Sequence, residues 1–287
     1  QGWVRWWPTQ RVVYVTETMP PPRRIPPALL DRFTLGRRAL LHYPESYCLE
    51  REDGAAATVY GPGTIQTWAN LIREGDLQGS YYGSTDIWLY ELLQSIGGLA
   101  GLSVVIVGSQ TPRYEAFCLA FDADRCTTLD YSRVRFDHPG IHTLTVAEYE
   151  AMPKDARPVF DVAISISSLE HDGLGRYGDP VNPDGDLDAM HNIRDNLLRP
   201  NGFLFLAVPF GADLVRWNLN RAYGPVRLPL LLDGWTLVLH AGVEPSRFEV
   251  TDPYDYLQPV MLLQNMRPEP DECAAAPSWA CSTSSKG

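Results

Sequence analysis

Between residues 64 and 267, segments with hydrophobic residues at every third or fourth position alternate with short, continuous apolar runs. The first pattern is typical of amphipathic helices and predicts helices over 64–74, 86–96, 113–121 and 187–198. The second predicts buried strands over 102–107, 126–129, 141–146, 159–166, 203–208, 235–240 and 259–263. Strands that alternate with helices favour an α/β fold, here a doubly wound, mainly parallel seven-stranded sheet.

The two ends of the chain have a different composition. We expect an N-terminal extension over 1–63, in which a tryptophan-rich start precedes a proline-rich segment at 20–27. Trp3, Trp6 and Trp7 are candidates for docking on a protein partner. Residues 64–267 form the predicted domain, and 268–287 is predicted to be a disordered tail because it is rich in Pro, Ala and Ser.

The charge balance argues against one class of partner. The chain has 24 Lys and Arg residues against 35 Asp and Glu residues, a formal net charge of -11, and no basic run. Nucleic-acid binders need a basic surface to neutralise phosphates, so we expect no nucleic-acid partner. No apolar stretch reaches the roughly 20 residues of a membrane span. The chain begins with Gln1 and not with Met, so the sequence leaves membrane attachment and compartment open.

Three segments in order resemble class I methyltransferases that use S-adenosylmethionine. The predicted second strand ends in Asp130, where a carboxylate can bind the two ribose hydroxyls of a cofactor. Residues 160–171, FDVAISISSLEH, resemble the fourth strand of that superfamily with its terminal LEH. Residues 198–209, LRPNGFLFLAVP, resemble its turn into the fifth strand. The resemblance spans about half of the chain and implies a Rossmann-like methyltransferase fold with S-adenosylmethionine as cofactor.

A narrower resemblance involves a group without an established reaction. SSLEHDGLGRYGDP at 167–180, NPDGD at 182–186 and WNLNRAYGP at 217–225 are similar to the domain of unknown function family 268. This similarity runs roughly from residue 81 to 225. It implies a methyltransferase-like fold and leaves the chemistry open.

The loop after the first strand differs from the superfamily pattern. Class I methyltransferases have a glycine-rich loop here, so that the backbone approaches the cofactor closely. This chain has GSQTPR at 108–113, with one glycine. By position, the residues expected to bind cofactor are Gly108, Ser109, Gln110, Asp130, Tyr131, Ser167 and Ser168. The alternative is a pocket filled by side chains such as Gln110 or Arg113.

The end of the fourth strand holds the candidate catalytic residues. Methyl transfer to a hydroxyl needs a base, and a histidine that titrates near neutrality suits this task. His171 is the candidate base, with Asp172 or Glu170 as the carboxylate that orients it. The competing interpretation is that His171 packs against the cofactor or a neighbouring helix.

The glycine-rich, charged segment 173–186 and the motif that begins at Trp217 supply the candidate acceptor-binding residues. These are Arg176, Tyr177, Asp179, Asp186, Asn220 and Arg221. Acids and tyrosines suit sugar hydroxyls, but the same residues fit two alternatives. One is a carboxylate-bound divalent metal, although we expect no resident metal. The other is a rigid network in which the loop holds itself together.

The sequence therefore predicts an S-adenosylmethionine-dependent O-methyltransferase that acts on a small polar or carbohydrate-like acceptor, including a glycan. The alternative is a catalytically inactive methyltransferase-like domain that serves as a binding or scaffold subunit. A nucleotide-binding oxidoreductase is a third possibility, weakened by the lack of a G-x-G-x-x-G motif. An enzyme predicts an open pocket beside Gly108, Asp130 and Ser167, and a scaffold predicts a filled one.

Overall fold

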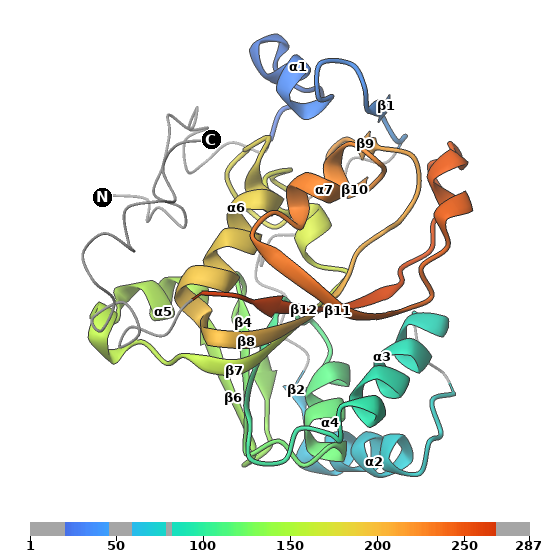
Figure 1. Cartoon of the computed structure of the whole chain (residues 1–287). Coiled ribbons are helices and arrows are strands. Elements are labelled where there is room, and N and C mark those ends of the chain that lie inside the picture. The colour runs from blue at the N-terminus through green and yellow to red at the C-terminus, as the bar shows by residue number, and fades with distance from the viewer. Residues whose placement is uncertain (1–20, 46–58, 79–81, 268–287) are drawn as a thin grey trace, which may run out of the picture.

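The computed structural model describes residues 21–45, 59–78 and 82–267, which surround one large sheet (Figure 1). The strand order is β11-β12-β8-β7-β3-β4-β6. In that order the strands span Trp235–Ala241, Val260–Asn265, Leu198–Ala207, Phe160–Ile166, Ser103–Val107, Arg125–Asp130 and Ile141–Thr145. Only β12 runs against the others in this sheet, because it is antiparallel to both of its neighbours. This order and the single reversed strand are those of the class I methyltransferase fold, so the fold prediction is confirmed.

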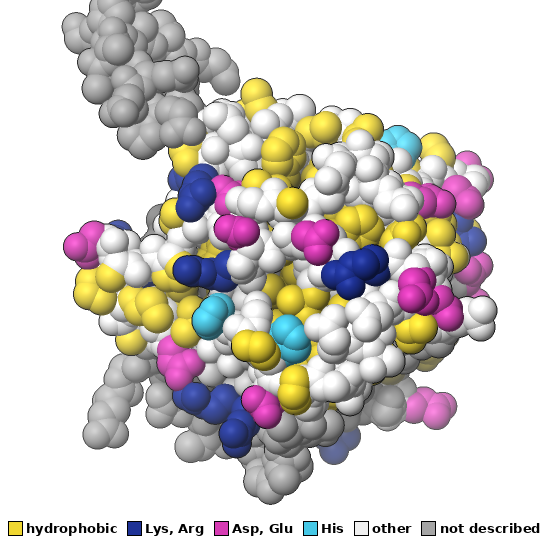
Figure 2. All heavy atoms as spheres, turned by 90° about the horizontal axis from the view of Figure 1, so that it is seen from below, with side chains coloured by type: hydrophobic (Ala, Val, Ile, Leu, Met, Phe, Trp, Pro, Cys, Tyr) yellow, Lys and Arg dark blue, Asp and Glu magenta, His cyan; other side chains and the backbone are white. Residues whose placement is uncertain are grey.

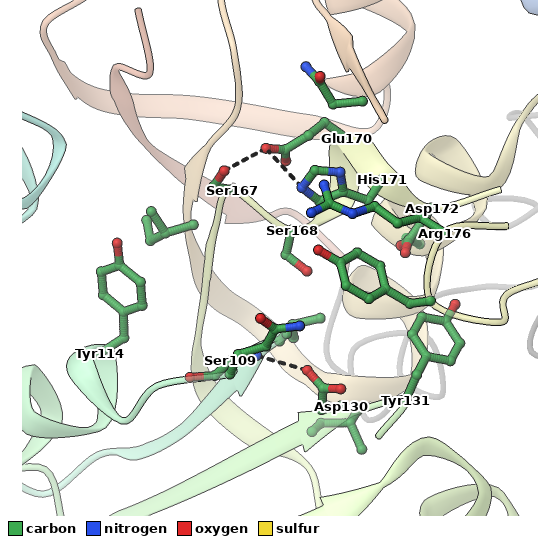
Figure 3. A pocket seen from close by; sticks show the side chains of 18 of the residues that line it. Ser109, Tyr114, Asp130, Tyr131, Ser167, Ser168, Glu170, His171, Asp172 and Arg176 are labelled. Carbon is green, nitrogen blue, oxygen red and sulfur yellow. Dashed lines mark hydrogen bonds and ion pairs between the residues drawn. The ribbon is translucent and has the colours of Figure 1, made fainter. Parts of the chain in front are cut away.

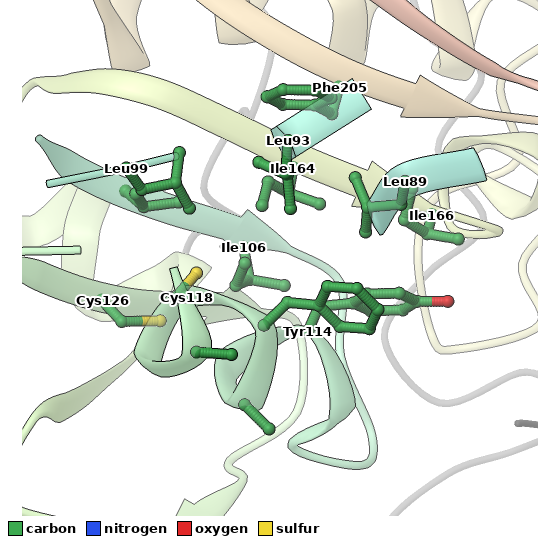
Figure 4. Packing of buried hydrophobic residues seen from close by; sticks show 14 of the residues in the cluster. Leu89, Leu93, Leu99, Ile106, Tyr114, Cys118, Cys126, Ile164, Ile166 and Phe205 are labelled. Carbon is green, nitrogen blue, oxygen red and sulfur yellow. The ribbon is translucent and has the colours of Figure 1, made fainter. Parts of the chain in front are cut away.

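Helices cover both faces of the sheet, as Figure 1 shows. On one face lie α2 (Pro62–Arg73), α3 (Ser84–Ser95) and α4 (Arg113–Ala120), and on the other lie α5 (Val146–Ala151), α6 (Gly185–Asn192) and α7 (Arg227–Leu231). In β3, Val104 and Ile106 pack on the first face and Val105 packs on the second. The continuous apolar run is therefore needed, because a central parallel strand is buried on both sides. Figure 4 shows the first of these two cores.

The predicted turn at 200–202 lies inside a strand. The predicted helix at 187–198 is α6 followed by a π-helical segment, Ile193–Leu197, and β8 begins at once with Leu198 instead of residue 203. Asn201 has a φ of 60°, and the ladder between β7 and β8 shifts register between Phe160 and Val162. The turn residues therefore form a bulge within β8, a feature that re-aims a strand without ending it.

A second, three-stranded sheet lies above the main one and has no counterpart among the predicted strands. It pairs β1 (Leu40–His42) with β9 (Leu214–Arg216) in parallel and β9 with β10 (Asn220–Ala222) in antiparallel fashion. A third core lies beside it, formed by Ile25, Leu29, Phe33, Leu174, Val181, Val215 and Trp217. The described part of the predicted extension is thus packed onto the domain through the 3-10 turn Pro27–Leu29 and α1 (Leu30–Phe33).

The remaining elements are short. They are the parallel pair β2 (Val59–Tyr60) and β5 (Arg135–Phe136), with 3-10 turns at Lys154–Ala156, Leu169–His171 and Pro245–Glu249. On the face shown in Figure 2, acidic, basic and hydrophobic side chains are interspersed. None of the described helices has the length and apolarity needed to cross a membrane. Trp3, Trp6, Trp7 and the predicted tail at 268–287 lie outside the described residues.

The third core generates a stability prediction. Phe33 is 1% exposed and its ring lies 5.1 Å from that of Trp217, whose Nε1 donates to the carbonyl of Pro22 at 2.8 Å. Phe33→Ala leaves a cavity at this contact, so we expect the free energy of unfolding to fall by about 3–5 kcal/mol in urea denaturation. Asp31→Ala, at an exposed position on the same helix, is the control and is expected to change it by less than about 0.5 kcal/mol. Equal effects of the two substitutions would contradict this assignment.

Candidate functional site

A cavity of about 680 Å³ opens at the carboxyl ends of β3, β4 and β7, where doubly wound sheets bind their ligands (Figure 3). The residues predicted to bind cofactor all line it: Gly108, Ser109, Gln110, Asp130, Tyr131, Ser167 and Ser168. The predicted catalytic residues Glu170, His171 and Asp172 line it as well. Of the predicted acceptor-binding residues, Arg176, Tyr177 and Asn220 do so. The topology thus brings together segments that are more than a hundred residues apart in sequence.

The single glycine of the first loop is required by a neighbouring strand end. Gly108 has a φ of 76°, and its N–H donates to the carbonyl of Leu129 at 2.9 Å. A Cβ at this position would lie 2.0 Å from Ser168 Oγ and 2.8 Å from Ser168 Cβ. The left-handed backbone and this close contact both demand glycine. The loop therefore turns tightly without a second glycine.

Asp130 joins the first loop to the end of β4. Its Oδ2 accepts from the N–H of Ser109 at 2.9 Å, and its Oδ1 accepts from the N–H of Ser132 at 2.8 Å. Both oxygens are thereby fixed in orientation at the cavity wall, as Figure 3 shows for Ser109 and Asp130. A carboxylate oxygen can accept more than one hydrogen bond, so these contacts leave it able to bind a ligand hydroxyl.

A buried acid lies beneath the same loop, and the sequence analysis did not identify it. Glu115 is fully buried on α4; its Oε1 accepts from Thr128 Oγ1 at 2.6 Å, and its Oε2 lies 3.2 Å from Ser109 Oγ. Burial raises its pKa to about 7, although the hydrogen bonds from Thr128 and Ser109 act in the opposite direction. Glu115 positions Ser109 from below and does not line the cavity. A glutamate in the first turn of a helix is an ordinary pattern, so nothing in the sequence marks Glu115 as buried.

At the end of β7 the chain makes a strained turn. Ser167 has a φ of 53°, uncommon for a residue other than glycine, and its hydroxyl donates to Glu170 Oε1 at 2.7 Å. Gln258 Nε2 in turn donates to Ser167 Oγ at 2.9 Å. Glu170 is 1% exposed and its Oε2 has no hydrogen-bond partner among the described residues. Burial raises its pKa to about 7 despite the bond from Ser167.

The geometry around His171 defines its tautomer. Its Nδ1 lies 2.6 Å from the carbonyl oxygen of Leu219. A carbonyl only accepts, so Nδ1 carries the proton, and the neutral ring has its lone pair on Nε2. Nε2 lies 3.8 Å from Glu170 Oε1, so Glu170, one of the two predicted supporting carboxylates, can form an ion pair with the protonated ring. The imidazole is 15% exposed, at the wall of the cavity.

Asp172 has a different environment. Burial raises its pKa well above the usual value, and the negative charges of Asp179 and Asp186 add to the effect, while Arg221 opposes it. The pKa of the neighbouring Tyr131 phenol is also raised, by burial first and then by the charges of Asp172 and Asp179. Both groups therefore favour their neutral forms, which can donate a hydrogen bond into the cavity.

Three predicted acceptor-binding residues do not line the cavity: Asp179, Asp186 and Arg221. Asp179 is buried inside its own loop, where its carboxylate accepts from the N–H groups of Gly173, Gly175 and Tyr177 at 2.7, 2.9 and 3.1 Å. This arrangement corresponds to the rigid-network interpretation. Because a buried carboxylate needs hydrogen-bond donors, the loop backbone turns inward to supply them.

Asp186 and Arg221 belong to a buried cluster behind the loop. Asp186 accepts from Arg227 Nε at 2.8 Å and from Tyr223 OH at 2.9 Å, and Arg221 Nε lies 3.8 Å from its Oδ1. Arg221 also donates to the carbonyl of Asp172 at 2.5 Å. Burial alone would raise the pKa of Asp186, but the two arginines and the hydrogen bonds lower it. Among the described residues, no three His, Cys, Asp or Glu side chains are grouped to hold a metal ion.

The cavity wall also includes residues that the sequence analysis did not single out. Besides aliphatic side chains, these include four tyrosines and one arginine: Tyr82, Tyr114, Arg216, Tyr254 and Tyr256. Arg216 had a recognisable signal, because it interrupts the apolar run LVRW at 214–217 that forms a buried strand. The tyrosines come from loops and from helix ends, whose contribution to a pocket depends on tertiary packing.

The family assignment agrees with this architecture. The model of one protein family, described as Caenorhabditis protein of unknown function, DUF268, matches residues 101–253, more than half of the chain. The chain belongs to this family. The match begins just before β3 and ends after the 3-10 turn at Pro245–Glu249, so it contains most of the cavity wall. None of the curated protein sequences matches the chain.

The solved structures that are similar to this chain include methyltransferases of low sequence identity. The 1,6-didemethyltoxoflavin-N1-methyltransferase of Burkholderia thailandensis has 17% identity over 74% of this chain and 94% of its own, with a TM-score of 0.44. The N-methyltransferase NodS of Bradyrhizobium japonicum WM9 has 14% identity over 62% and 93%, with a TM-score of 0.40. An S-adenosylmethionine dependent methyltransferase of Mesorhizobium loti has 14% identity over 61% and 96%, with a TM-score of 0.39. Similarities this distant identify neither a substrate nor a reaction.

The buried acid beneath the loop gives a pH-dependent prediction. Since the pKa of Glu115 rises from 4.5 in the unfolded chain to about 7 in the folded one, the unfolded state loses its proton first as the pH increases. The free energy of unfolding should therefore fall between about pH 4.5 and pH 7, by roughly 2–4 kcal/mol from this group. Glu115→Gln should remove this part of the slope, as measured by urea denaturation at several pH values. Glu74→Gln, exposed at the end of α2, is the control; an unchanged slope in Glu115→Gln would be evidence against the assignment.

Proposed function

We propose that this protein is an S-adenosylmethionine-dependent O-methyltransferase that acts on a small polar or carbohydrate-like acceptor. The observation that carries the proposal is the open cavity at the carboxyl ends of β3, β4 and β7. Asp130 and His171 both line this one cavity. In a sheet of methyltransferase topology this is the position of cofactor and acceptor. Its volume of about 680 Å³ falls within the usual range of small-molecule sites.

The residues at the first loop and at β4 fit the cofactor. Asp130, held by the N–H groups of Ser109 and Ser132, would bind the ribose hydroxyls. Leu129, Tyr131 and Ile166 give the cavity apolar and aromatic surface suited to an adenine ring. When bound, S-adenosylmethionine supplies an electrophilic methyl group. The loop at Gly108 is compatible with it because the Ser109 hydroxyl is engaged by the Thr111 carbonyl and Glu115.

The scaffold alternative predicts a pocket filled by Gln110 or Arg113, and the cavity does not favour it. Arg113 points away, where its Nε donates to Asp86 Oδ2 at 2.9 Å and its guanidinium lies 5.6 Å from the centre of the Phe117 ring. Gln110 is exposed at the rim. The scaffold function would gain support if the protein failed to bind cofactor.

His171 is the proposed base. The bond from Nδ1 to the carbonyl of Leu219 holds the ring so that Nε2 accepts the proton of the acceptor hydroxyl. The resulting imidazolium lies 3.8 Å from Glu170 Oε1, and the ionised form of Glu170 stabilises that charge. Because the pKa of Glu170 is about 7, the glutamate ionises in the same range in which the histidine must be neutral. The proposed pair therefore works at or above neutral pH.

The cofactor assignment is tested by calorimetric titration with S-adenosylmethionine and S-adenosylhomocysteine. We expect micromolar binding by the parent protein, and binding weakened by at least about tenfold in Asp130→Asn, because the amide nitrogen replaces one acceptor oxygen with a donor. The matched control is Asp161→Asn. Asp161 also accepts a backbone N–H, that of Ser103 at 2.8 Å, but it lies at the opposite end of the sheet.

Unchanged binding is expected in the control. If the folded parent protein gave neither heat nor a thermal shift with either compound, the methyltransferase proposal would fail and the scaffold function would replace it. Binding that persisted unchanged in Asp130→Asn would refute the ribose role alone.

The role of His171 as the base is tested after an acceptor has been found. An acceptor is recognised because S-adenosylhomocysteine is released in its presence. His171→Asn should lower kcat by about 10²–10⁴-fold, because the general base is lost, and leave the Kd for S-adenosylmethionine unchanged. His191→Asn makes the same substitution on α6, outside the cavity wall, and should leave kcat unchanged. A His171→Asn variant with the parent rate would assign His171 a packing role only.

A further inference from the structure

One arginine in the cavity wall is buried without an acidic partner. Arg216 ends β9 and is 6% exposed. Its Nη1 donates to Asn220 Oδ1 at 3.2 Å, and its guanidinium lies 4.3 Å from the centre of the Tyr254 ring. Its Nε has no hydrogen-bond partner among the described residues. The guanidinium thus interacts with an amide oxygen and an aromatic ring, both of which are uncharged.

Other buried arginines of the protein are paired with acids. Arg227 and Arg221 share Asp186, and even the partly buried Arg113 forms an ion pair, with Asp86 at 2.9 Å. In contrast, Arg216 forms an ion pair with no acid in the described part of the chain. Burial of a charge is costly unless it is paired, and its persistence at a cavity wall indicates that an occupant of the cavity supplies the counter-charge.

The chemistry of this group restricts the counter-charge. A guanidinium presents a planar array of donors that matches the two oxygens of a carboxylate or phosphate. Stacking on Tyr254 holds the plane of the group in place, and the residue lines the cavity while its buried Nε still lacks an acceptor among the described residues. Asn220 is buried in the same wall; its Nδ2 donates one N–H to the carbonyl of Arg221 at 3.0 Å and has a second N–H for an anion.

We propose that Arg216, with Asn220, forms a subsite for a carboxylate or phosphate group of the acceptor. The identification of the ligand as the acceptor rests on the proposed methyltransferase function, whereas the anion site itself rests on Arg216. The acceptor is accordingly an anionic small molecule, such as a sugar acid or sugar phosphate. A neutral sugar would leave the guanidinium uncompensated.

The subsite lies on the same turn that orients the proposed base. Arg216 and Asn220 are paired across the β9–β10 ladder, and Leu219 lies between them in sequence. The Leu219 N–H donates to the Arg216 carbonyl at 2.6 Å, and the Leu219 carbonyl accepts from His171 Nδ1. An acceptor anchored through its anionic group is therefore held by the same turn that orients the base. A nearby acid in the wall, Asp172, has a raised pKa because it is buried, which reduces its repulsion of an anion.

The test measures anion binding directly. Inorganic phosphate and glucuronate are titrated calorimetrically into the full chain at constant ionic strength in chloride-free buffer, with and without S-adenosylhomocysteine, and glucose is the neutral comparison. We expect the parent to bind both anions and not glucose. Arg216→Met should weaken anion binding by more than about tenfold, and Arg216→Lys, which keeps the charge without the planar fork, should fall between them.

A second readout separates a binding role from a structural one. If Arg216 awaits its counter-charge from a ligand, Arg216→Met removes an uncompensated buried charge, and the melting temperature of the ligand-free protein should stay the same or rise. The matched control, Arg227→Met, breaks the pair with Asp186 and should lower it. A large fall in Arg216→Met would indicate a structural arginine and overturn the proposal.

Two further results would overturn it. One is the absence of phosphate and glucuronate binding by the parent in both states, and the other is equal binding by parent and Arg216→Met. If Arg216→Met weakened S-adenosylmethionine binding as strongly as Asp130→Asn, the anion would be the cofactor carboxylate and not the acceptor. Failure of the methyltransferase proposal is distinguishable, because cofactor binding would then be absent while Arg216-dependent anion binding persisted.

Discussion

The site depends on one buried ion cluster, in which Asp186 on α6 receives Arg227 from α7 and Arg221 from β10. The remaining donors of Arg221 reach the carbonyls of Asp172 and Pro183, so the cluster ties the loop after β7 to the segment after β8. A buried charge pair gives little net stability, but breaking it leaves a charge without compensation and is strongly unfavourable. The cluster therefore fixes the relative position of two segments that lack a common sheet.

That fixed position determines the chemistry of His171. The imidazole belongs to the loop after β7, whereas the carbonyl that holds its Nδ1 belongs to Leu219, in the turn between β9 and β10. Neither segment alone sets the tautomer. The N-terminal residues complete this arrangement, because Phe33 packs on Trp217 and β1 pairs with β9. A region that resembles an extension in the sequence is consequently packed against the segment that orients the base.

The sequence was informative wherever a strand end fixes a residue. The positions of Gly108, Asp130 and His171 follow from the order of apolar runs, since parallel strands present their carboxyl ends at one edge. The roles of residues whose environment is set by tertiary contacts were harder to predict from the sequence. Asp186 and Arg221 have the charge and spacing of ligand-binding residues, and only their burial against each other shows their structural role. Arg216 is the opposite case. It was not predicted as a site residue, because it lies in a short strand that the hydrophobic pattern did not predict.

The acids divide into two groups with opposite effects on stability. The lowered pKa of Asp186 means that its contribution is present above the usual value of 3.8 and is lost as the pH falls through its own, lower pKa. Glu115 and Glu170, with pKa values raised to about 7, act in the other direction, and their cost develops as the pH rises from 4.5 to about 7. Protonation of Asp186 thus lowers the stability of the folded state at acid pH. Ionisation of Glu115 and Glu170 lowers it near neutral pH. Glu170 ionises near neutral pH, and its ionised form is the one that supports His171. Burial disfavours this ionised form. The paired charges of the Asp186 cluster help to keep the protein folded when Glu170 is ionised.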